Sequence, residues 1–207
     1  MIAIIDYGVG NLFSLERSFA AIGAEVEITS DPDRIRAADK ILLPGVGAFG
    51  DAAAKLRANG LDQEVLEQAA TGKPLMGICL GMQLLFDESL EYGCHKGLGL
   101  IPGRVVPIQQ VIPENLKIPH MGWNGLKMEK DSPLFSKISD GDCVYFVHSF
   151  CAVGCEDALI ATSEYGAPVT AAVQKGNVFG CQFHPEKSGT VGLNILRAFA
   201  EMEANGC

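Results

Sequence analysis

Cys79 stands between two glycines in the stretch GICLG, residues 77–81, after one apolar run and before another. The glycines allow a sharp turn, because side chains at positions 77 and 81 would collide with a neighbouring strand and helix. A nucleophile on a strand-to-helix turn is the elbow of the α/β-hydrolases, here with cysteine in place of serine. The turn also puts Cys79 at a helix N-terminus, which favours the thiolate. The alternative is an inert buried thiol, the commonest fate of a free cysteine.

A thiolate nucleophile needs a base, and the chain has four histidines. His184, in the stretch CQFHPEKS, is the best candidate because it ends a predicted strand and Pro185 holds it in an extended conformation. In extended chain, Glu186 would face the same side and reach the imidazole. A carboxylate there fixes the tautomer of the ring and stabilises the imidazolium. The alternative is a surface His-Pro turn with a solvated glutamate. The other histidines are His95, His120 and His148.

Backbone N–H groups are the expected oxyanion donors for such a nucleophile. Leu80, directly after the cysteine, supplies one candidate. The glycine-rich stretch PGVG, residues 44–47, follows a predicted strand and supplies others. Its alternatives are a simple strand-to-helix turn or a phosphate loop, but the Lys-Ser/Thr pair of a phosphate loop does not follow it.

The elements that position these residues alternate in the first half of the chain. Strands are predicted over residues 2–5, 26–29, 41–43 and 74–78. A first helix is predicted from Asn11, which can cap it, to about position 22. One or two helices are predicted over residues 51–70, and another begins at Leu80. This order predicts an α/β fold with a doubly wound, mostly parallel sheet and helices on both faces. Sites in such sheets form at the carboxyl ends of strands, where Cys79 and the PGVG loop fall.

The second half shows short β-like runs over residues 104–108, 144–147, 159–162 and 170–173. They predict a mixed or antiparallel strand extension on one side of the sheet. A further strand over residues 178–183 and a closing helix over 189–204 follow. With neither repeat nor linker, residues 1–207 are predicted to form a single domain.

Composition excludes several classes of partner. The net charge is −9 and Lys and Arg do not cluster, which argues against nucleic acid and against an anionic membrane. The N-terminus lacks the features of a signal peptide, and no apolar run is long enough to cross a bilayer. Seven scattered cysteines then suggest free thiols in a reducing, cytoplasmic setting. Cys151 and Cys155, with Cys143 nearby, lack a second matching pair, so neither a metal nor a cofactor is predicted.

The stretches PGVGAF, GICLGMQ and FHPEKS, in that order, resemble the class I (triad) glutamine amidotransferases. The stretches DYGVGN, PHMGWN and YFVHSF are specific to a smaller group of these proteins. They resemble the branch of that family formed by the glutaminase subunits of imidazole glycerol phosphate synthases. The likeness spans nearly the whole chain.

This resemblance implies a glutaminase that forms a γ-glutamyl thioester and releases glutamate and ammonia. It implies a catalytic triad of nucleophile, base and orienting carboxylate, namely Cys79, His184 and Glu186. It implies oxyanion donors on the backbone of Val46, Gly47 and Leu80. It also implies substrate contacts from Gln83 and Glu91, although Glu91 reads equally well as an exposed acid at a helix end.

The resemblance further implies a heterodimer with a (β/α)8-barrel cyclase, which uses the ammonia to make imidazole glycerol phosphate and an aminoimidazole carboxamide ribotide. The residues expected at or near the partner face are Asn11, Trp123, Tyr145 and Lys187. Three alternatives remain: an amidotransferase of another pathway, a free-standing cysteine hydrolase, and a non-catalytic α/β binding domain with Asp6 as a switch carboxylate.

Overall fold

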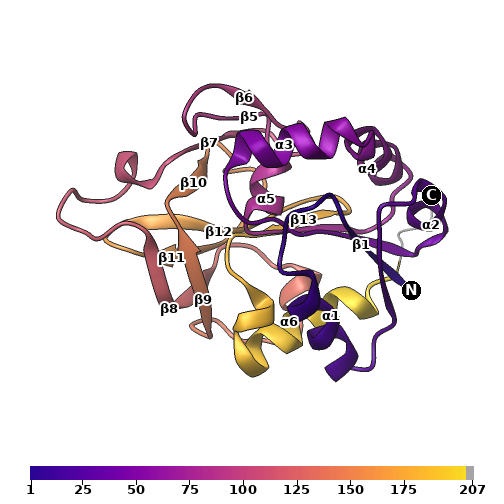
Figure 1. Ribbon diagram of the computed structural model, residues 1–207. Coiled ribbons are helices and arrows are strands. Elements are labelled where there is room, and N and C mark those ends of the chain that lie inside the picture. The colour runs from indigo at the N-terminus through magenta and orange to yellow at the C-terminus, as the bar shows by residue number, and fades with distance from the viewer. Residues whose placement is uncertain (204–207) are drawn as a thin grey trace.

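A nine-stranded sheet forms the centre of the computed structural model, which describes residues 1–203 (Figure 1). Its strand order is β2-β1-β3-β4-β13-β12-β11-β8-β9. The first five strands are mutually parallel and are β2 (Val26–Thr29), β1 (Ile2–Ile5), β3 (Lys40–Leu43), β4 (Leu75–Ile78) and β13 (Val178–Cys181). The other four continue it antiparallel and are β12 (Pro168–Lys175), β11 (Leu159–Glu164), β8 (His120–Met128) and β9 (Cys143–His148).

Helices cover both faces of the parallel half, as Figure 1 shows. One face carries α1 (Leu12–Ala21) and α6 (Gly189–Glu201), whose apolar sides pack in one core cluster. The opposite face carries α3 (Phe49–Ala58), α4 (Leu61–Ala70) and the short α5 (Leu80–Leu84). The predicted doubly wound α/β fold is therefore confirmed. No helix within residues 1–203 is long and apolar enough to cross a membrane.

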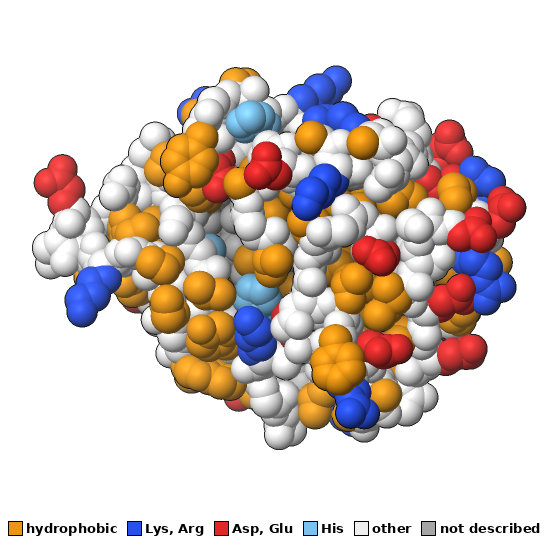
Figure 2. Space-filling view, in the orientation of Figure 1, with side chains coloured by type: hydrophobic (Ala, Val, Ile, Leu, Met, Phe, Trp, Pro, Cys, Tyr) orange, Lys and Arg blue, Asp and Glu red, His pale blue; other side chains and the backbone are white. Residues whose placement is uncertain are grey.

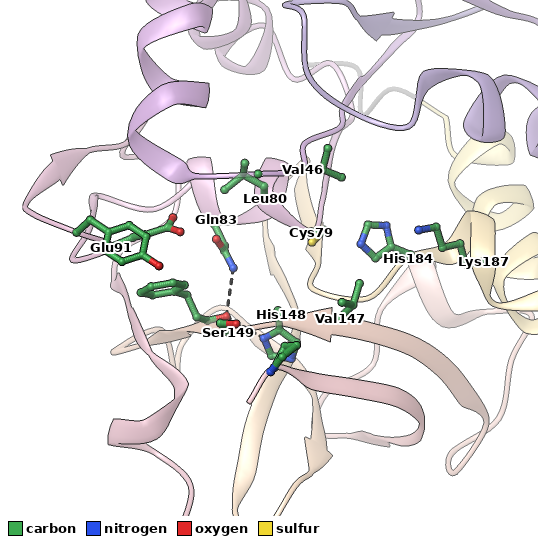
Figure 3. A pocket seen from close by; sticks show the side chains of 14 residues that line it. Val46, Cys79, Leu80, Gln83, Glu91, Val147, His148, Ser149, His184 and Lys187 are labelled. Carbon is green, nitrogen blue, oxygen red and sulfur yellow. Dashed lines mark hydrogen bonds between the residues drawn. The ribbon is translucent and has the colours of Figure 1, made fainter. Parts of the chain in front are cut away.

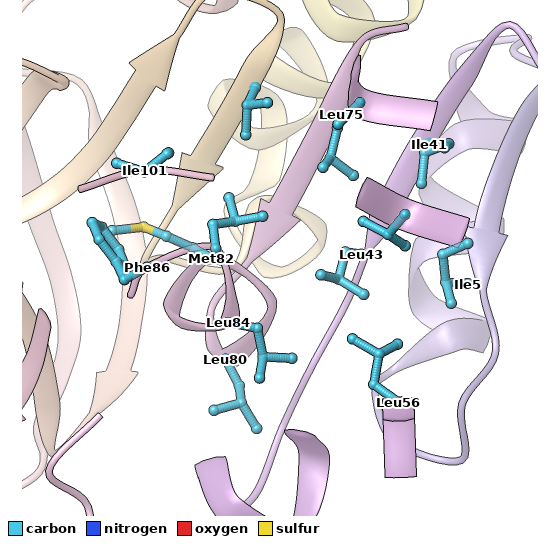
Figure 4. Packing of buried hydrophobic residues seen from close by; sticks show 14 of the residues in the cluster. Ile5, Ile41, Leu43, Leu56, Leu75, Leu80, Met82, Leu84, Phe86 and Ile101 are labelled. Carbon is cyan, nitrogen blue, oxygen red and sulfur yellow. The ribbon is translucent and has the colours of Figure 1, made fainter. Parts of the chain in front are cut away.

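The inner strands β1, β4 and β13 are buried along their whole length, which explains why they appear in the sequence as unbroken apolar runs, whereas the edge strand β2 is only partly buried. Successive side chains of a strand point to opposite faces. Ile5 accordingly packs in the cluster under α3 and α4, whereas Ile4 packs in the cluster under α1 and α6. Figure 4 shows the first cluster, in which Leu43 and Leu75 of the sheet lie opposite Leu56 of α3.

A second, four-stranded sheet lies beside the main one and was not predicted. Its order is β10 (Phe150–Val153), β7 (Arg104–Pro107), β5 (Glu88–Ser89) and β6 (His95–Lys96). The sequence placed residues 104–108 in the extension of the main sheet, and this was wrong. Strand β7 pairs instead with β10 and β5. Strand β10 lies far from β7 in the sequence, and β5 is only two residues long. Local sequence contains no signal for such pairing.

Other boundaries differ from the prediction in ways that local chemistry explains. The unpredicted helix α2 (Pro32–Ala37) begins where the Asp31 side chain accepts a hydrogen bond from the Asp33 N–H. The predicted segment 51–70 is two helices, separated at Gly60, which has φ +68°. Asn11 occupies the N-cap of α1 as predicted, but its side chain makes no capping hydrogen bond. Helix α6 ends at Glu201, and position 204 of the predicted helix lies outside the described residues.

Three neighbouring parallel strands bring the predicted site together. Strand β4 lies between β3 and β13 and is parallel to both. The carboxyl ends of the three strands therefore meet at one edge of the sheet. The PGVG loop follows β3, Cys79 follows β4, and His184 follows β13.

The turn at Cys79 requires glycine on both sides. Cys79 itself has φ 54° and ψ −112°, a conformation that non-glycine residues rarely adopt. A Cβ at Gly77 would lie 2.6 Å from the Gly81 carbonyl oxygen in α5. A Cβ at Gly81 would lie 1.8 Å from the Leu43 carbonyl oxygen in β3. The predicted collisions with strand and helix are confirmed.

We expect Gly81→Ala to lower the free energy of unfolding by at least ~3 kcal/mol, because the added methyl meets backbone that cannot move aside. Gly23→Ala is the control, since Gly23 has φ +74° but nothing within 4 Å of its Cβ position. It should cost about 1 kcal/mol of backbone strain alone. Urea unfolding of both variants checks this, and equal losses would contradict the close packing at the elbow.

Candidate active site

A pocket of about 390 Å³ opens at the carboxyl edge of β3, β4 and β13. That volume is in the range of small-molecule sites. Figure 3 shows Cys79 and His184 side by side, with Gln83 lying between Cys79 and Glu91. The pocket thus collects residues that are more than a hundred positions apart in the sequence.

His184 and Glu186 form the predicted pair. Nδ1 of His184 lies 2.9 Å from Oε1 of Glu186, and both side chains are almost completely buried. The predicted route to this contact was wrong. Residues Pro185–Lys187 form a 3-10 helix, so Glu186 reaches the ring by a tight turn and not through extended chain. Pro185 is the first residue of that turn, a position suited to its fixed φ and missing N–H.

The surroundings of His184 hold its ring and its charge. The backbone N–H of His184 donates to the Tyr145 carbonyl at 2.9 Å, and its own carbonyl accepts from the Ser188 hydroxyl at 2.6 Å. Burial alone would lower the pKa of His184. Hydrogen bonds and charge from Cys79 and Glu186 outweigh burial and raise that pKa to about 9. The histidine is therefore held as an imidazolium between the Cys79 sulfur and the Glu186 side chain.

The loop after β3 lies against the start of α5, and Figure 3 shows its Val46 close to Cys79. Val46 and Gly47 line the pocket with Leu80, as the sequence predicted for oxyanion donors. The N–H groups of these three residues donate no hydrogen bond to another group within residues 1–203. Val46 is 41% exposed and Gly47 has φ +96°. Free N–H groups beside a thiol are what an oxyanion requires.

Gln83 lies one turn beyond Cys79 and is buried in the pocket wall. Its Nε2 donates to the Phe150 carbonyl at 3.2 Å and to Oε1 of Gln182 at 3.0 Å. Since an amide nitrogen carries two hydrogens, both donors are used. The side-chain oxygen of Gln83 is the atom left for a ligand.

Glu91 is not an exposed acid at a helix end, which was one of the two alternatives for this residue. It follows β5, is buried, and lines the pocket. One carboxylate oxygen accepts from the Phe49 N–H at 2.6 Å, at the first residue of α3. The other oxygen is available to a cation in the pocket.

Three of the predicted partner-face residues form one row beside the pocket. The rings of Trp123 and Tyr145 lie 6.0 Å apart, and Nζ of Lys187 is 5.9 Å from the centre of the Tyr145 ring. Trp123 is 56% exposed, so it is not a core residue. Asn11 begins α1, which contacts the turn that carries Lys187. Figure 2 shows apolar side chains gathered over β8 and β9, beside the hollow of the pocket.

Two residues near the site were not predicted. Gln182 is fully buried, and its Nε2 lies 3.7 Å from Sγ of Cys79. His148 lines the pocket, and burial lowers its pKa to about 4, which makes it neutral and unsuited to pair with a thiolate. The sequence signal for Gln182 was its position two residues before His184, which places both on the same face of an extended chain.

Cys151 and Cys155 are free and buried, and Cys143 is exposed. No group of three potential metal-binding side chains occurs among residues 1–203. Burial raises the pKa of Cys151 to about 12, so that thiol stays protonated and inert.

Solved structures share the fold. A glutamine amidotransferase crystal structure matches with a TM-score of 0.75 at 18% identity, covering 97% of this chain and 98% of that one. PurLQS from Thermotoga maritima matches with a TM-score of 0.75 at 22% identity, covering 96% of each chain. At these identities the likeness concerns the fold alone.

Sequence relatives are closer. The HisH subunit of imidazole glycerol phosphate synthase from Bacillus licheniformis is 51% identical over 204 residues, which is 97% of this chain and 96% of the relative. The HisH subunit from Syntrophotalea carbinolica is 49% identical over 207 residues, covering 98% and 100%. The family model for glutamine amidotransferase class-I matches residues 3–202. The chain therefore belongs to the class-I glutamine amidotransferase family, among the HisH subunits of imidazole glycerol phosphate synthase.

Proposed function

We propose that this chain, as one domain over residues 1–207, hydrolyses glutamine and passes the ammonia to a cyclase subunit in histidine biosynthesis. The observation that carries this is the pairing of a strained, pocket-lining Cys79 with a buried His184 and Glu186. Relatives at about half identity carry the name of a synthase subunit, which favours this pathway over another amidotransferase and over a free-standing hydrolase.

In the first half of the reaction, the Cys79 thiolate attacks the side-chain carbonyl carbon of glutamine. The oxygen of the tetrahedral intermediate becomes negative and accepts hydrogen bonds from the free N–H groups of Val46, Gly47 and Leu80. His184, held protonated beside the sulfur, donates its proton to the departing nitrogen. Ammonia leaves, and a γ-glutamyl thioester remains on Cys79.

In the second half, the same histidine works in reverse. Neutral His184 takes a proton from water as the water attacks the thioester, and Glu186 stabilises the imidazolium that forms. Glutamate leaves and the thiolate is restored. No metal or cofactor is needed for either half.

Substrate recognition follows from the atoms that remain free in the pocket wall. The side-chain oxygen of Gln83 accepts from an N–H of the substrate, because both hydrogens of its nitrogen are already donated. The free carboxylate oxygen of Glu91 faces the substrate ammonium. The Gln83 acceptor favours glutamine over glutamate, since the γ-carboxylate of glutamate has no N–H to donate to it.

The partner is a (β/α)8-barrel cyclase that binds as a heterodimer over the row Trp123–Tyr145–Lys187 and Asn11. This face borders the pocket mouth, so ammonia leaves the site directly into the partner. An enclosed path is required because ammonia in water becomes ammonium, which is not a nucleophile. A cytoplasmic location stays a prediction.

The first test is glutamate release from glutamine by the chain alone and with a cyclase subunit plus its nucleotide ligand. Release should rise in the mixture, and Cys79→Ala should lower it by ~10⁴-fold or more, as removal of other nucleophiles does. Cys79→Ala should still bind the cyclase, which separates lost chemistry from lost folding. Unchanged glutamate release in Cys79→Ala would refute the nucleophile.

A second test concerns the charge on His184. We expect Glu186→Gln to lower the pKa of His184 below its wild-type value of about 9, because a neutral amide replaces the carboxylate. The folded pKa lies above the ordinary 6.5, so this pair stabilises the fold fully below pH 6.5 and loses its effect as pH rises towards 9. That loss should be smaller in Glu186→Gln. NMR titration of the ring measures the pKa of His184, and urea unfolding at pH 6 and pH 9 measures the loss of stability. Identical titrations of the wild type and Glu186→Gln would contradict the pairing of His184 with Glu186.

A third test concerns the partner face. We expect Trp123→Ala to raise the Kd for the cyclase by ~30-fold, since exposed tryptophans at interface centres contribute about 2 kcal/mol or more. Lys175→Ala is the control, because Lys175 pairs with the first residue of β13, at the opposite edge of the sheet from the pocket. Calorimetry with the cyclase compares them. Equal affinities would place the interface elsewhere.

A further inference from the structure

A chain of side-chain amides leads from the second sheet to the sulfur of Cys79. It runs from the Phe150 carbonyl to Gln83, from Gln83 to Gln182, and from Gln182 to Cys79. The three contacts measure 3.2, 3.0 and 3.7 Å, the last being a contact to sulfur. Gln182 and Gln83 are both buried.

The direction of every hydrogen bond in this chain follows from its first member. Phe150 lies in β10, the edge strand of the four-stranded sheet. The N–H of Ile108 donates to the Ser149 carbonyl, so in an antiparallel ladder the Phe150 carbonyl points to the open side of that edge. A carbonyl oxygen only accepts, so the amide nitrogen of Gln83 must face it.

The orientation of Gln182 is then determined at both of its ends. The nitrogen of Gln83 is a donor, so the atom of Gln182 that meets it must be Oε1. Nε2 of Gln182 is left facing Sγ of Cys79. The opposite orientation would set two donors against each other at 3.0 Å and an oxygen against a thiolate. Both contacts therefore select the same orientation.

We propose that Gln182 is a further catalytic residue of this site, which donates a hydrogen bond to the Cys79 thiolate and is held in that orientation by Gln83. The inference deepens the proposed function, because it concerns the same nucleophile. An amide donor favours the thiolate over the thiol, as hydrogen bonds to an ionised acceptor generally do. Unlike the oxyanion donors, Gln182 acts on the sulfur before substrate arrives.

The same chain of contacts gives Gln83 a second role beyond substrate binding. If Gln83 lost its nitrogen, the amide of Gln182 could rotate, and its oxygen would then face the sulfur for part of the time. A change at Gln83 should therefore make the thiolate form of Cys79 less favourable, although Gln83 itself makes no hydrogen bond to the sulfur. A purely structural role for Gln182 predicts no such effect.

The test measures the pH dependence of Cys79 alkylation by iodoacetamide, followed by mass spectrometry of the peptide that contains it. Exposed Cys143 on the same chain is the internal reference. Gln182→Met removes the donor without adding charge and should move the alkylation midpoint upward by about one pH unit, or ~10-fold in rate below the midpoint. Gln83→Met should move it in the same direction by less. Gln174→Met is the control, because Gln174 also donates and accepts hydrogen bonds but lies outside the pocket.

An unchanged Cys79 midpoint in folded Gln182→Met would overturn the proposal, even if glutamate release fell. If Gln182→Met does not fold, the near-isosteric Gln182→Glu decides. It retains an acceptor for Gln83 and should raise the midpoint further, and no rise would again overturn the proposal. Alkylation needs no glutamine, so this result is independent of the glutaminase assay. The proposed function fails if Cys79→Ala retains glutamate release, whatever the alkylation midpoints.

Discussion

The close approach of Gly81 to the Leu43 carbonyl is the constraint on which the rest of the site depends. It brings the start of α5 against the end of β3, and Cys79 must then adopt its unusual backbone conformation to connect β4 to that helix. The same approach sets the PGVG loop beside the sulfur, because the loop is the direct continuation of β3. The predicted nucleophile and oxyanion donors are thus positioned by one backbone contact between helix α5 and strand β3.

The charges of the site are held by burial and mutual pairing. A buried imidazolium is costly unless anions compensate it, and His184 has the Cys79 sulfur on one side and Glu186 on the other. Within residues 1–203, Oε2 of Glu186 is the buried side-chain atom without a hydrogen-bond partner. The His184 ring is therefore the hydrogen-bond partner of the Glu186 side chain, through Oε1. This favours a histidine that stays protonated until the proton is needed by the leaving nitrogen.

The second sheet contributes to the chemistry although it carries no member of the triad. Its edge strand β10 supplies the carbonyl that orients Gln83, and β5 leads to Glu91, which also contacts the start of α3. One wall of the pocket is therefore built from the main sheet and the opposite wall from the smaller one. Glu91 and Cys79 therefore come from different sheets, and their spacing depends on how the two sheets pack.

The parallel half of the fold, the elbow at Cys79 and the predicted triad of Cys79, His184 and Glu186 could be inferred from the sequence. These features depend on local rules: unbroken apolar runs for buried strands, glycine where a Cβ has no room, and residue types suited to acyl transfer. The sequence did not determine the second sheet, strand β8, or the turn through which Glu186 reaches His184. Strand β8 contains Gly122 and Gly125, which interrupt the apolar alternation, and β7 pairs with residues distant in sequence. The burial of Glu91 and the orientation of Gln182 depend on contacts between segments far apart in the chain, and only the tertiary structure decides which donors and acceptors meet.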